Sequence, residues 1–442
     1  MMDPNKVLVL RTRFPEEQVE RIAELWSGLR GHSGQLLFKP NLIHHRHLTG
    51  GDYRAVVTQP EVLALAWNAA DRLGFSGTRA VADAPQSDAD FATILEKTGL
   101  DGWGREFGTR IVDLRKIYFE GTREVVLRRH ELPGDPAGAV LVDLGRRSAF
   151  FGVEGRTYYG ADYDIAYTNR HHAGETHEYL FSGTALQSDI VLNVPKLKTH
   201  KKAGVTLSMK NLVGLNADKN LLPHHSMGPP EDGGDAYVTA ASRQRFEAGM
   251  LRSVKPLLAR SQLASRAAGV LKPLARRVLG DTLEVVRSGN WWGNDTVWRM
   301  ILDLDRILLY ARADGTVADS RQRQTLALID GIIAGEGNGP EAPDPTRTNV
   351  LVAGVDFVAV DVVAATLMGF DYRKIPHLSH AFEPHPLPLT NADPDALTVE
   401  SNVPEWNRNL WEIDPEALFR FRPHFGWRNH IEREPATATV AG

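Results

Sequence analysis

The sequence predicts an α/β fold with a mainly parallel or mixed twisted sheet, flanking helices and a helical insertion. Three observations predict it. Apolar runs alternate with helical patterns in the first part of the chain, the alternation resumes near residue 177, and a compositional break at residues 227–323 interrupts it. Alternation of strand and helix is typical of βαβ units, whose strands lie parallel in one sheet.

Short apolar runs that are typical of buried strands occur early, at Lys6–Leu10, Gln35–Phe38 and Thr78–Ala82. Helical patterns at Glu16–Leu29 and Gln59–Leu73 separate them. The second pattern repeats its apolar residues close to the 3.6-residue period of a helix. Thr58 and Glu61 have the spacing of a capping box at its start.

A group of shorter strands is predicted next, at Arg110–Leu114, Glu124–Leu127 and Ala139–Val142. The turn sequence Pro133-Gly134-Asp135-Pro136 lies between the last two. Proline and glycine at these positions favour a reversal of the chain. We therefore expect a local antiparallel patch.

The alternation then resumes, with helices expected at His177–Gln187, Val205–Leu215 and Phe357–Met368 and strands at Ile190–Val194, Thr325–Ile329 and Asn349–Ala353. We divide the chain into an α/β core of residues 1–226 and 324–384, a helical, partly basic insertion of residues 227–323, and a C-terminal extension of residues 385–442. In the insertion, Ser242–Gly280 holds nine Lys or Arg and one acid. This segment is either a helical lid with a solvated basic face or a surface for an anionic membrane or nucleic acid.

Composition excludes several classes of site. The chain has no cysteine, which excludes disulfides, thiolate-held iron–sulfur clusters, cysteine-based zinc sites and cysteine nucleophiles. The net charge of −4 is too small to predict a specific nucleic-acid partner. The longest apolar stretch, Asn349–Phe370, contains Asp356 and Asp361, and the start of the chain lacks a signal-peptide pattern. We expect a cytoplasmic protein.

Ionisable residues follow five predicted strands, at Lys39, Asp83, Lys196, Asp330 and Asp356. Ligands of open parallel sheets bind beyond the carboxyl ends of the strands, where loops and helix N-termini converge. We therefore expect these side chains to meet at one edge of the sheet.

Residues 196–211 form the densest polar segment of the chain. Lys196, Lys198 and His200 share one face if the segment is extended, and Thr206 and Lys210 share one face of the following helix. With the amides at that helix's N-terminus they would attract phosphate or carboxylate. The alternative is a solvated lysine run, which the interleaved apolar residues make less favourable. The predicted substrate-binding residues are Lys39, Asn41, Lys196, Thr206, Lys210, Asn211 and Asn338.

The predicted catalytic residues are His200, Lys198, Asp330 and Glu336. His200 is assigned as acid or base, and the carboxylates as groups that orient a metal or water. Asp330–Pro340 also contains alternating glycines, which would let the backbone approach a ligand closely or form a tight structural turn. Asp361 is expected to be a buried partner of a backbone or lysine group.

Two further chemistries stay open. His45 and His47, two residues apart on a strand, would point the same way and could hold a divalent metal. The alternative is that these histidines are exposed or make ordinary hydrogen bonds. A lysine whose pKa is lowered by neighbouring cations could instead form an imine or tether a cofactor.

Six blocks of sequence resemble one known family, the prokaryotic Domain of Unknown Function 362. The blocks are Lys39–Asn41, Thr58–Val62, Asn193–His200, Val205–Gly214, Asp330–Gly331 with Glu336–Pro340, and Val358–Asp361 with Met368–Phe370. The resemblance implies family membership more firmly than a reaction. Members often accompany ferredoxin-like cysteine clusters, which implies redox roles. Because this chain has no cysteine, any such cluster would belong to a separate redox partner.

Three functions compete. The first is a cytoplasmic enzyme that binds a small phosphate- or carboxylate-bearing metabolite in a Lys- and His-rich cleft, with or without help from a metal or cofactor. The second is a non-catalytic protein that binds a cofactor or a partner's acidic segment at the same edge. The third is a membrane-surface protein that uses the basic insertion.

Overall fold

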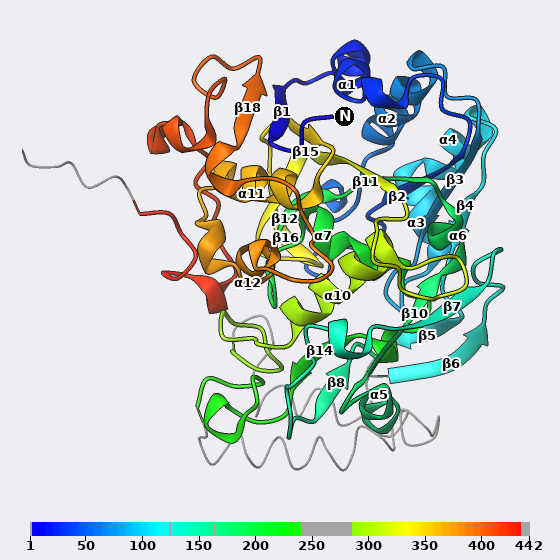
Figure 1. The fold of residues 1–442 in the computed structure, drawn as a ribbon, viewed down its shortest axis with the longest axis vertical. Coiled ribbons are helices and arrows are strands. Elements are labelled where there is room, and N and C mark those ends of the chain that lie inside the picture. The colour runs from blue at the N-terminus through cyan, green and yellow to red at the C-terminus, as the bar shows by residue number, and fades with distance from the viewer. Residues whose placement is uncertain (1, 123–124, 163, 240–284, 435–442) are drawn as a thin grey trace, which may run out of the picture.

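The centre of the protein is one large sheet. The structure is a computed structural model that describes residues 2–122, 125–162, 164–239 and 285–434 (Figure 1). Its main strand order is β18-β1-β17-β15-β11-β2-β3-β4, and the shorter β12 and β16 pair with β15. Helices lie on both sides, which confirms the predicted α/β class.

Most of the strands begin where the sequence predicts them. The bounds are β1 (Lys6–Arg11), β2 (Gln35–Pro40), β3 (Thr78–Asp83), β4 (Ile111–Asp113), β11 (Ile190–Val194), β12 (Lys196–His200), β13 (Gly204–Val205), β15 (Gln324–Asn338), β16 (Ala342–Thr346), β17 (Val350–Gly354) and β18 (Thr398–Ser401). Along the main strand order of the described residues, β17 alone is antiparallel to its neighbours β1 and β15. Because of this reversal, the carboxyl end of β17 lies at the opposite edge of the sheet from the carboxyl ends of its neighbours.

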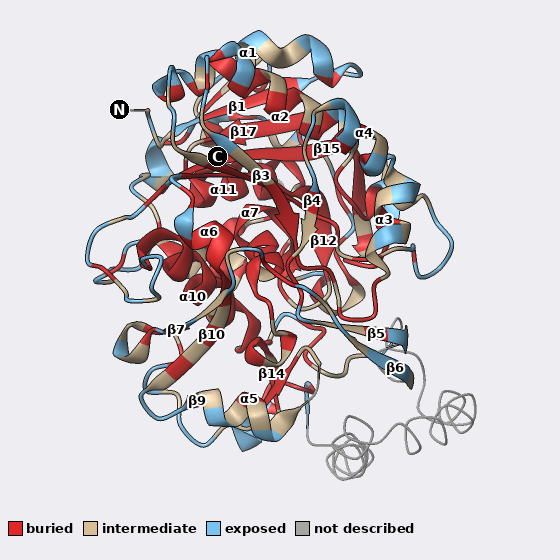
Figure 2. Cartoon of the chain, turned by 90° about the vertical axis from the view of Figure 1, so that its right-hand side faces the viewer, coloured by how far each residue is buried: buried red, intermediate tan, exposed pale blue. Residues whose placement is uncertain are grey.

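Alternating side chains of β1 divide the core into two layers. Val7 and Val9 belong to one buried apolar cluster, and Leu8 and Leu10 belong to the other. The first cluster includes residues of α7 (Leu207–Asn211), α10 (Val297–Tyr310) and α11 (Phe357–Leu367), and the second includes residues of α1 (Val19–Leu25), α2 (Pro60–Arg72), α3 (Phe91–Thr98) and α4 (Leu100–Glu106). The sheet is therefore buried between two helical layers, as its red strands show (Figure 2).

The predicted antiparallel patch exists, with different pairing. β5 (Ile117–Thr122) pairs with β6 (Val125–Glu131), whereas β7 (Ala139–Asp143) pairs with β10 (Thr176–Ser182), which also pairs with the short β9 (His172–Ala173). The turn before β7 therefore does not close a hairpin with β6. The remaining small elements are β8 (Tyr158–Gly160), β14 (Pro223–Ser226), α5 (Ile165–His171), α6 (Gly183–Gln187) and α12 (Pro376–Ser379).

Two predictions of secondary structure are wrong. The helix predicted at His177–Gln187 is strand β10 followed by the single short helix α6; buried and half-buried residues alternate along most of β10, which is the period of a strand. The strand predicted to end at Ile329 is longer than expected. β15 continues through the glycine-rich stretch as far as Asn338, because β16 pairs with it.

Thr58 does not cap α2, contrary to the predicted capping box. Gln59 occupies the N-cap position and makes no side-chain capping bond. The Thr58 hydroxyl instead donates to the Val194 carbonyl at 2.6 Å and accepts the Asn41 amide at 2.8 Å. Thr58 therefore fastens the end of β11 to the chain that leaves β2.

The segment predicted as an insertion contributes to the core. Its helix α10 is buried at nearly every position, and in the C-terminal extension β18 pairs with β1. The domain boundaries stay a prediction. The basic segment Ser242–Gly280 lies outside the described residues, so its predicted role at a membrane is not addressed. Within the described ranges, every helix is too short or too polar to cross a bilayer.

Leu328 tests the importance of the central strand. Its side chain is fully buried in β15, opposite Ala353 of β17. We expect Leu328→Ala to lower the free energy of unfolding by about 2–5 kcal/mol, because it leaves a cavity in the core. Urea unfolding measures the loss. The control is Leu141→Ala on β7, whose side chain is 45% exposed; an equal loss in both variants would contradict the placement of β15.

Candidate functional site

All strands of the main order except β17 have their carboxyl ends at one edge of the sheet. β2, β3, β11 and β15 are mutually parallel, so Lys39, Asp83 and Asp330 lie along that edge, as predicted. Asp356 does not. Because β17 is antiparallel, its carboxyl end lies at the opposite edge, where Asp356 lines a different pocket together with the start of β1.

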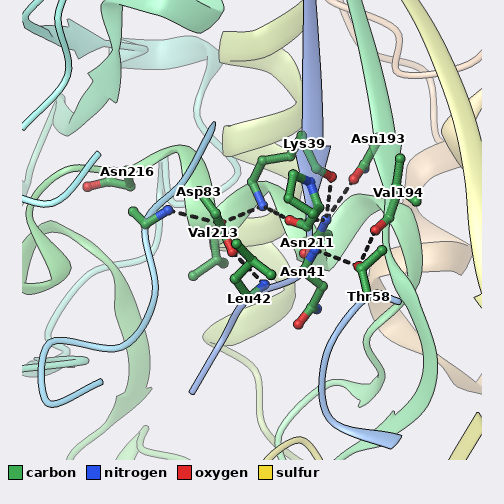
Figure 3. Close-up of polar contacts among 12 residues, drawn as sticks. Lys39, Asn41, Leu42, Thr58, Asp83, Asn193, Val194, Asn211, Val213 and Asn216 are labelled. Atoms are coloured by element: carbon green, nitrogen blue, oxygen red, sulfur yellow. Dashed lines mark hydrogen bonds and ion pairs between the residues drawn. The ribbon is translucent and has the colours of Figure 1, made fainter. Parts of the chain in front are cut away.

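Lys39 is paired with an acid of the neighbouring strand. Its ammonium lies 2.7 Å from Asp83 Oδ1 and donates to the Pro40 carbonyl at 2.8 Å (Figure 3). Asp83 also accepts the amides of Leu42 and Ala84. Burial lowers the pKa of Lys39, and the charge of Asp83 opposes that effect. The pair joins the ends of β2 and β3.

Lys196 and Asp330 form a second, fully buried pair. Their charged groups are 2.8 Å apart, and Asp330 also accepts the backbone amides of Gln59 and Ile332. Lys196 is predicted to bind substrate and Asp330 to be catalytic. In the structure the two side chains pair with each other, and neither lines the pocket described below.

Lys198 has no acidic partner in the described part of the chain, but its three donors are used. It donates to the Val56 carbonyl at 2.6 Å and, at longer range, to Asn41 Oδ1 and the Pro340 carbonyl. Complete burial lowers the pKa of Lys198 well below its usual value. Lys198 therefore lies behind Asn41, without contact with the pocket described next.

A pocket of about 150 Å³ opens beyond this edge of the sheet. Five predicted site residues line it: Asn41, His200, Thr206, Lys210 and Asn211. The polar residues that line it without having been assigned to the site are Asp83, Gln86, Ser87, Asp162, Lys201, Lys202, Lys219, His224 and Glu341. We call this site the Lys210 pocket.

Lys210 stands apart from the other lysines. It lies near the end of α7, its side chain is buried, with 6% of the residue exposed, and its ammonium has no hydrogen bond or ion pair among the described residues. Burial and the nearby charge of Lys219 lower the pKa of Lys210 to about 7. A cation that pays this desolvation cost without a counter-charge is typical of a functional position.

The N-terminus of α7 is already occupied. Asp361 of α11 accepts the Ser208 and Met209 amides at 2.7 and 2.8 Å, which confirms its predicted role as a buried backbone partner. Burial raises the pKa of Asp361 to about 7. The prediction that these amides attract a ligand is wrong, because the protein's own carboxylate takes them. Gly204 has a φ of +79°, as expected for the turn before α7.

His200 faces the pocket as a hydrogen-bond donor. Its Nδ1 accepts the amides of Lys202 and Ala203, both at 3.1 Å. A neutral imidazole in that arrangement carries its proton on Nε2. Burial and the charge of Lys210 lower the pKa of His200 well below its usual value, so the ring is neutral. In the ligand-free protein His200 is thus a hydrogen-bond donor, and its role as acid or base stays a prediction.

The unassigned lysines of the pocket have partners. Lys219 donates to the carbonyls of Ala84, Val213 and Asn216, and its pKa is lowered to about 8 by burial. Lys201 lies 3.2 Å from Glu341. The loop that holds Lys219 carries no motif, and Glu341 is distinguished only by following the glycine-rich stretch. The sequence around Lys219 and Glu341 is therefore not specific enough to predict that they line a site.

Residues 133–366, more than half of the chain, match the model of a family described as Domain of unknown function (DUF362). The chain belongs to this family. The matched region contains β12, α7 and the glycine-rich part of β15, whereas the resembling blocks at Lys39–Asn41 and Thr58–Val62 lie before it. The DUF362 match therefore includes His200 and Lys210 but not the ends of β2 and β3.

A thylakoid-associated protein of Synechocystis sp. is similar to this DUF362 chain. The two are 23% identical over 198 residues, which is 45% of this chain and 38% of that protein. The chain thus matches well under half of its relative's length. The name of that relative gives a location and no reaction.

Glu336 and Asn338, predicted as site residues, lie away from the Lys210 pocket of this DUF362 protein. Glu336 accepts the Arg422 amide at 2.9 Å, and the Arg422 guanidinium also bonds to Asp344. The glycines of this stretch allow close packing of the protein itself: a Cβ at Gly339 would overlap the Thr199 carbonyl. The glycines therefore serve the packing of the protein, which supports a structural role over close approach to a ligand.

His45 and His47 engage separate partners. His45 Nδ1 accepts the Asp90 amide, while His47 Nδ1 accepts the Gly51 amide and its Nε2 lies 2.8 Å from the Pro343 carbonyl. Both ring nitrogens of His47 are thus occupied by protein. In the described ranges, no three His, Asp or Glu side chains gather as a metal site would require. The structure gives the predicted metal site no support.

Gly214 is required beside the Lys39–Asp83 pair. A Cβ at this position would overlap Asp83 Oδ1 and crowd Lys39 Nζ. We expect Gly214→Ala to lower the free energy of unfolding by about 1–3 kcal/mol through overpacking. Urea unfolding measures this. In the control, Gly102→Ala in α4, the added Cβ meets only the Arg105 guanidinium at 3.8 Å, an ordinary van der Waals contact, so the change should be neutral or slightly stabilising. Equal behaviour of the two variants would contradict the close approach at Gly214.

Lys210→Met should stabilise the ligand-free protein. Between pH 7 and about 10 the unfolded state holds the Lys210 proton and the native state does not, so the wild-type protein becomes more stable as the pH rises. The destabilisation caused by burying Lys210 therefore shrinks over this range. We expect a gain of about 1–3 kcal/mol at pH 7 that shrinks at pH 9.5. Urea unfolding at both values measures it, with exposed Lys116→Met as control. A lower free energy of unfolding for Lys210→Met than for the wild type at both pH values would contradict this prediction, because Lys210 would then have a compensating charge.

Proposed function

We propose that this protein is an enzyme that binds a small metabolite bearing a phosphate or carboxylate in the Lys210 pocket. The observation that carries the proposal is the buried ammonium of Lys210, which lines the pocket without a counter-ion in the described structure. A bound anion would supply the missing charge. Burial makes that interaction stronger than it would be in water.

The charges around Lys210 support an anionic ligand. Asp83 is neutralised by Lys39, Glu341 lies beside Lys201, and Asp162 accepts the Ser87 hydroxyl. None of these three carboxylates of the pocket pairs with Lys210 in the described structure. The neutral His200 ring adds a donor, not an acceptor. A phosphate or carboxylate would therefore find an excess of donors and positive charge in this pocket.

Catalysis, as opposed to binding alone, is supported by the pKa of Lys210. A group with a pKa of about 7 exists in both protonation states at neutral pH, which suits a proton donor or acceptor in a reaction. The non-catalytic alternative would need only a permanently charged lysine. A surface lysine with its usual pKa would serve that purpose without the cost of burial.

Sulfate binding tests the proposal, because sulfate keeps its charge between pH 6 and 8. If binding requires the ammonium of Lys210, the fraction of competent protein falls about tenfold between these values, and the affinity falls with it. Isothermal titration calorimetry at constant ionic strength measures the two affinities.

The matched variants are Lys210→Met and the exposed Lys116→Met. Lys210→Met should bind sulfate at least tenfold more weakly than the wild type at pH 6, and the difference should shrink at pH 8. Lys116→Met should behave as the wild type. Equal sulfate affinity in the wild type and Lys210→Met at pH 6 would overturn the proposal.

A further inference from the structure

Lys210 is the one pocket lysine in the described chain whose amine is left without a protein partner. The other lysines at this edge are held by acids, carbonyls or a histidine ring: Lys39, Lys196, Lys198, Lys201, Lys202 and Lys219. An amine that donates to such partners has its geometry fixed by them. The Lys210 amine is free to turn its lone pair toward a molecule in the pocket.

The surroundings of Lys210 favour a free amine. Its side chain is enclosed, and the cation of Lys219 is near enough to disfavour a second positive charge. A lysine amine that is desolvated and close to another cation is a nucleophile near neutral pH. The same lysine in water would be almost wholly protonated.

The pocket also offers hydrogen-bond donors for an oxygen atom. Thr206, one helical turn before Lys210, lines the pocket, and its buried hydroxyl has no partner in the described structure. His200 presents Nε2–H, as argued above. These groups can donate to the oxygen of a carbonyl while its carbon faces the Lys210 amine.

We propose that Lys210 is the nucleophile of an imine-forming site, and that the substrate is a small aldehyde or ketone that also carries a carboxylate, such as a 2-oxo acid. The inference rests on the proposed function, since the carboxylate is the anion that the pocket attracts. It adds a covalent step and names the substrate class.

The step balances without an oxidant or reductant. The lone pair of Lys210 Nζ forms a bond to the carbonyl carbon, and the π electrons of the C=O bond move to oxygen, which takes one proton from Nζ. The resulting carbinolamine then loses its hydroxyl group together with the second Nζ proton as water. A C=N bond to Lys210 remains.

Reductive trapping tests the inference. The full-length protein is incubated with glyoxylate and sodium cyanoborohydride, which reduces imines, and peptide mass spectrometry locates the carboxymethyl group. We expect modification at Lys210 to exceed that at exposed Lys116 at least tenfold at pH 7. The yield at Lys210 should rise between pH 6 and 8, opposite to the pH dependence of sulfate affinity, and sulfate should compete.

Lys210→Arg is the decisive variant, because it keeps a positive charge and lacks the nucleophilic amine. It should retain sulfate binding and lose trapping at position 210, while Lys116→Met should retain trapping at Lys210. If glyoxylate competes with sulfate but Lys210 is modified no more than Lys116, the imine is refuted and the anion site stands. If neither glyoxylate nor sulfate binds, both proposals fail.

Discussion

The need to compensate buried positive charge governs the carboxyl edge of this sheet. Seven lysines gather there, and six of them are matched by partners that the fold supplies: carboxylates of adjacent strands for Lys39 and Lys196, and carbonyls, an acid or a histidine ring for the others. Each match requires two segments to meet at hydrogen-bond distance, so the same contacts that neutralise charge also fix the strand ends. Lys210 has no such partner in the described chain. Because the other six lysines have partners, this absence distinguishes Lys210 as a candidate functional residue.

Much of the framework could be predicted from sequence, because it depends on local pattern. Apolar runs located β1, β2, β3 and β11, and the rule that ligands bind at carboxyl strand ends led to the correct edge. The exceptions depend on partners distant in sequence. The direction of β17 places Asp356 at the other edge, and the pairing of β16 extends β15 beyond the predicted end of that strand at Ile329. A single sequence does not encode these pairings in any local signal.

The site was predicted in part for the same reason. Thr206 is the N-cap of α7 and Lys210 lies four residues later in this helix, so their common position at the pocket follows from helical spacing. The sequence could not show which lysine has a hydrogen-bond or ion-pair partner within the protein. Lys198 and Lys210 look alike as letters in a basic run, yet one meets three acceptors and the other none in the described structure. The difference lies in the distances from each ammonium to nearby acceptor atoms. It distinguishes a structural lysine from a candidate reactive one.

The position of β1 has a consequence for the newly made chain. Both neighbours of this strand, β17 and β18, come from residues beyond 349, although β1 itself begins at Lys6. During synthesis its apolar residues leave the ribosome with both edges unpaired and stay so until most of the polypeptide has emerged. Exposed strand edges of this kind invite association with other chains. Completion of the sheet is therefore a late event, and until then the apolar residues of β1 are open to association with other chains.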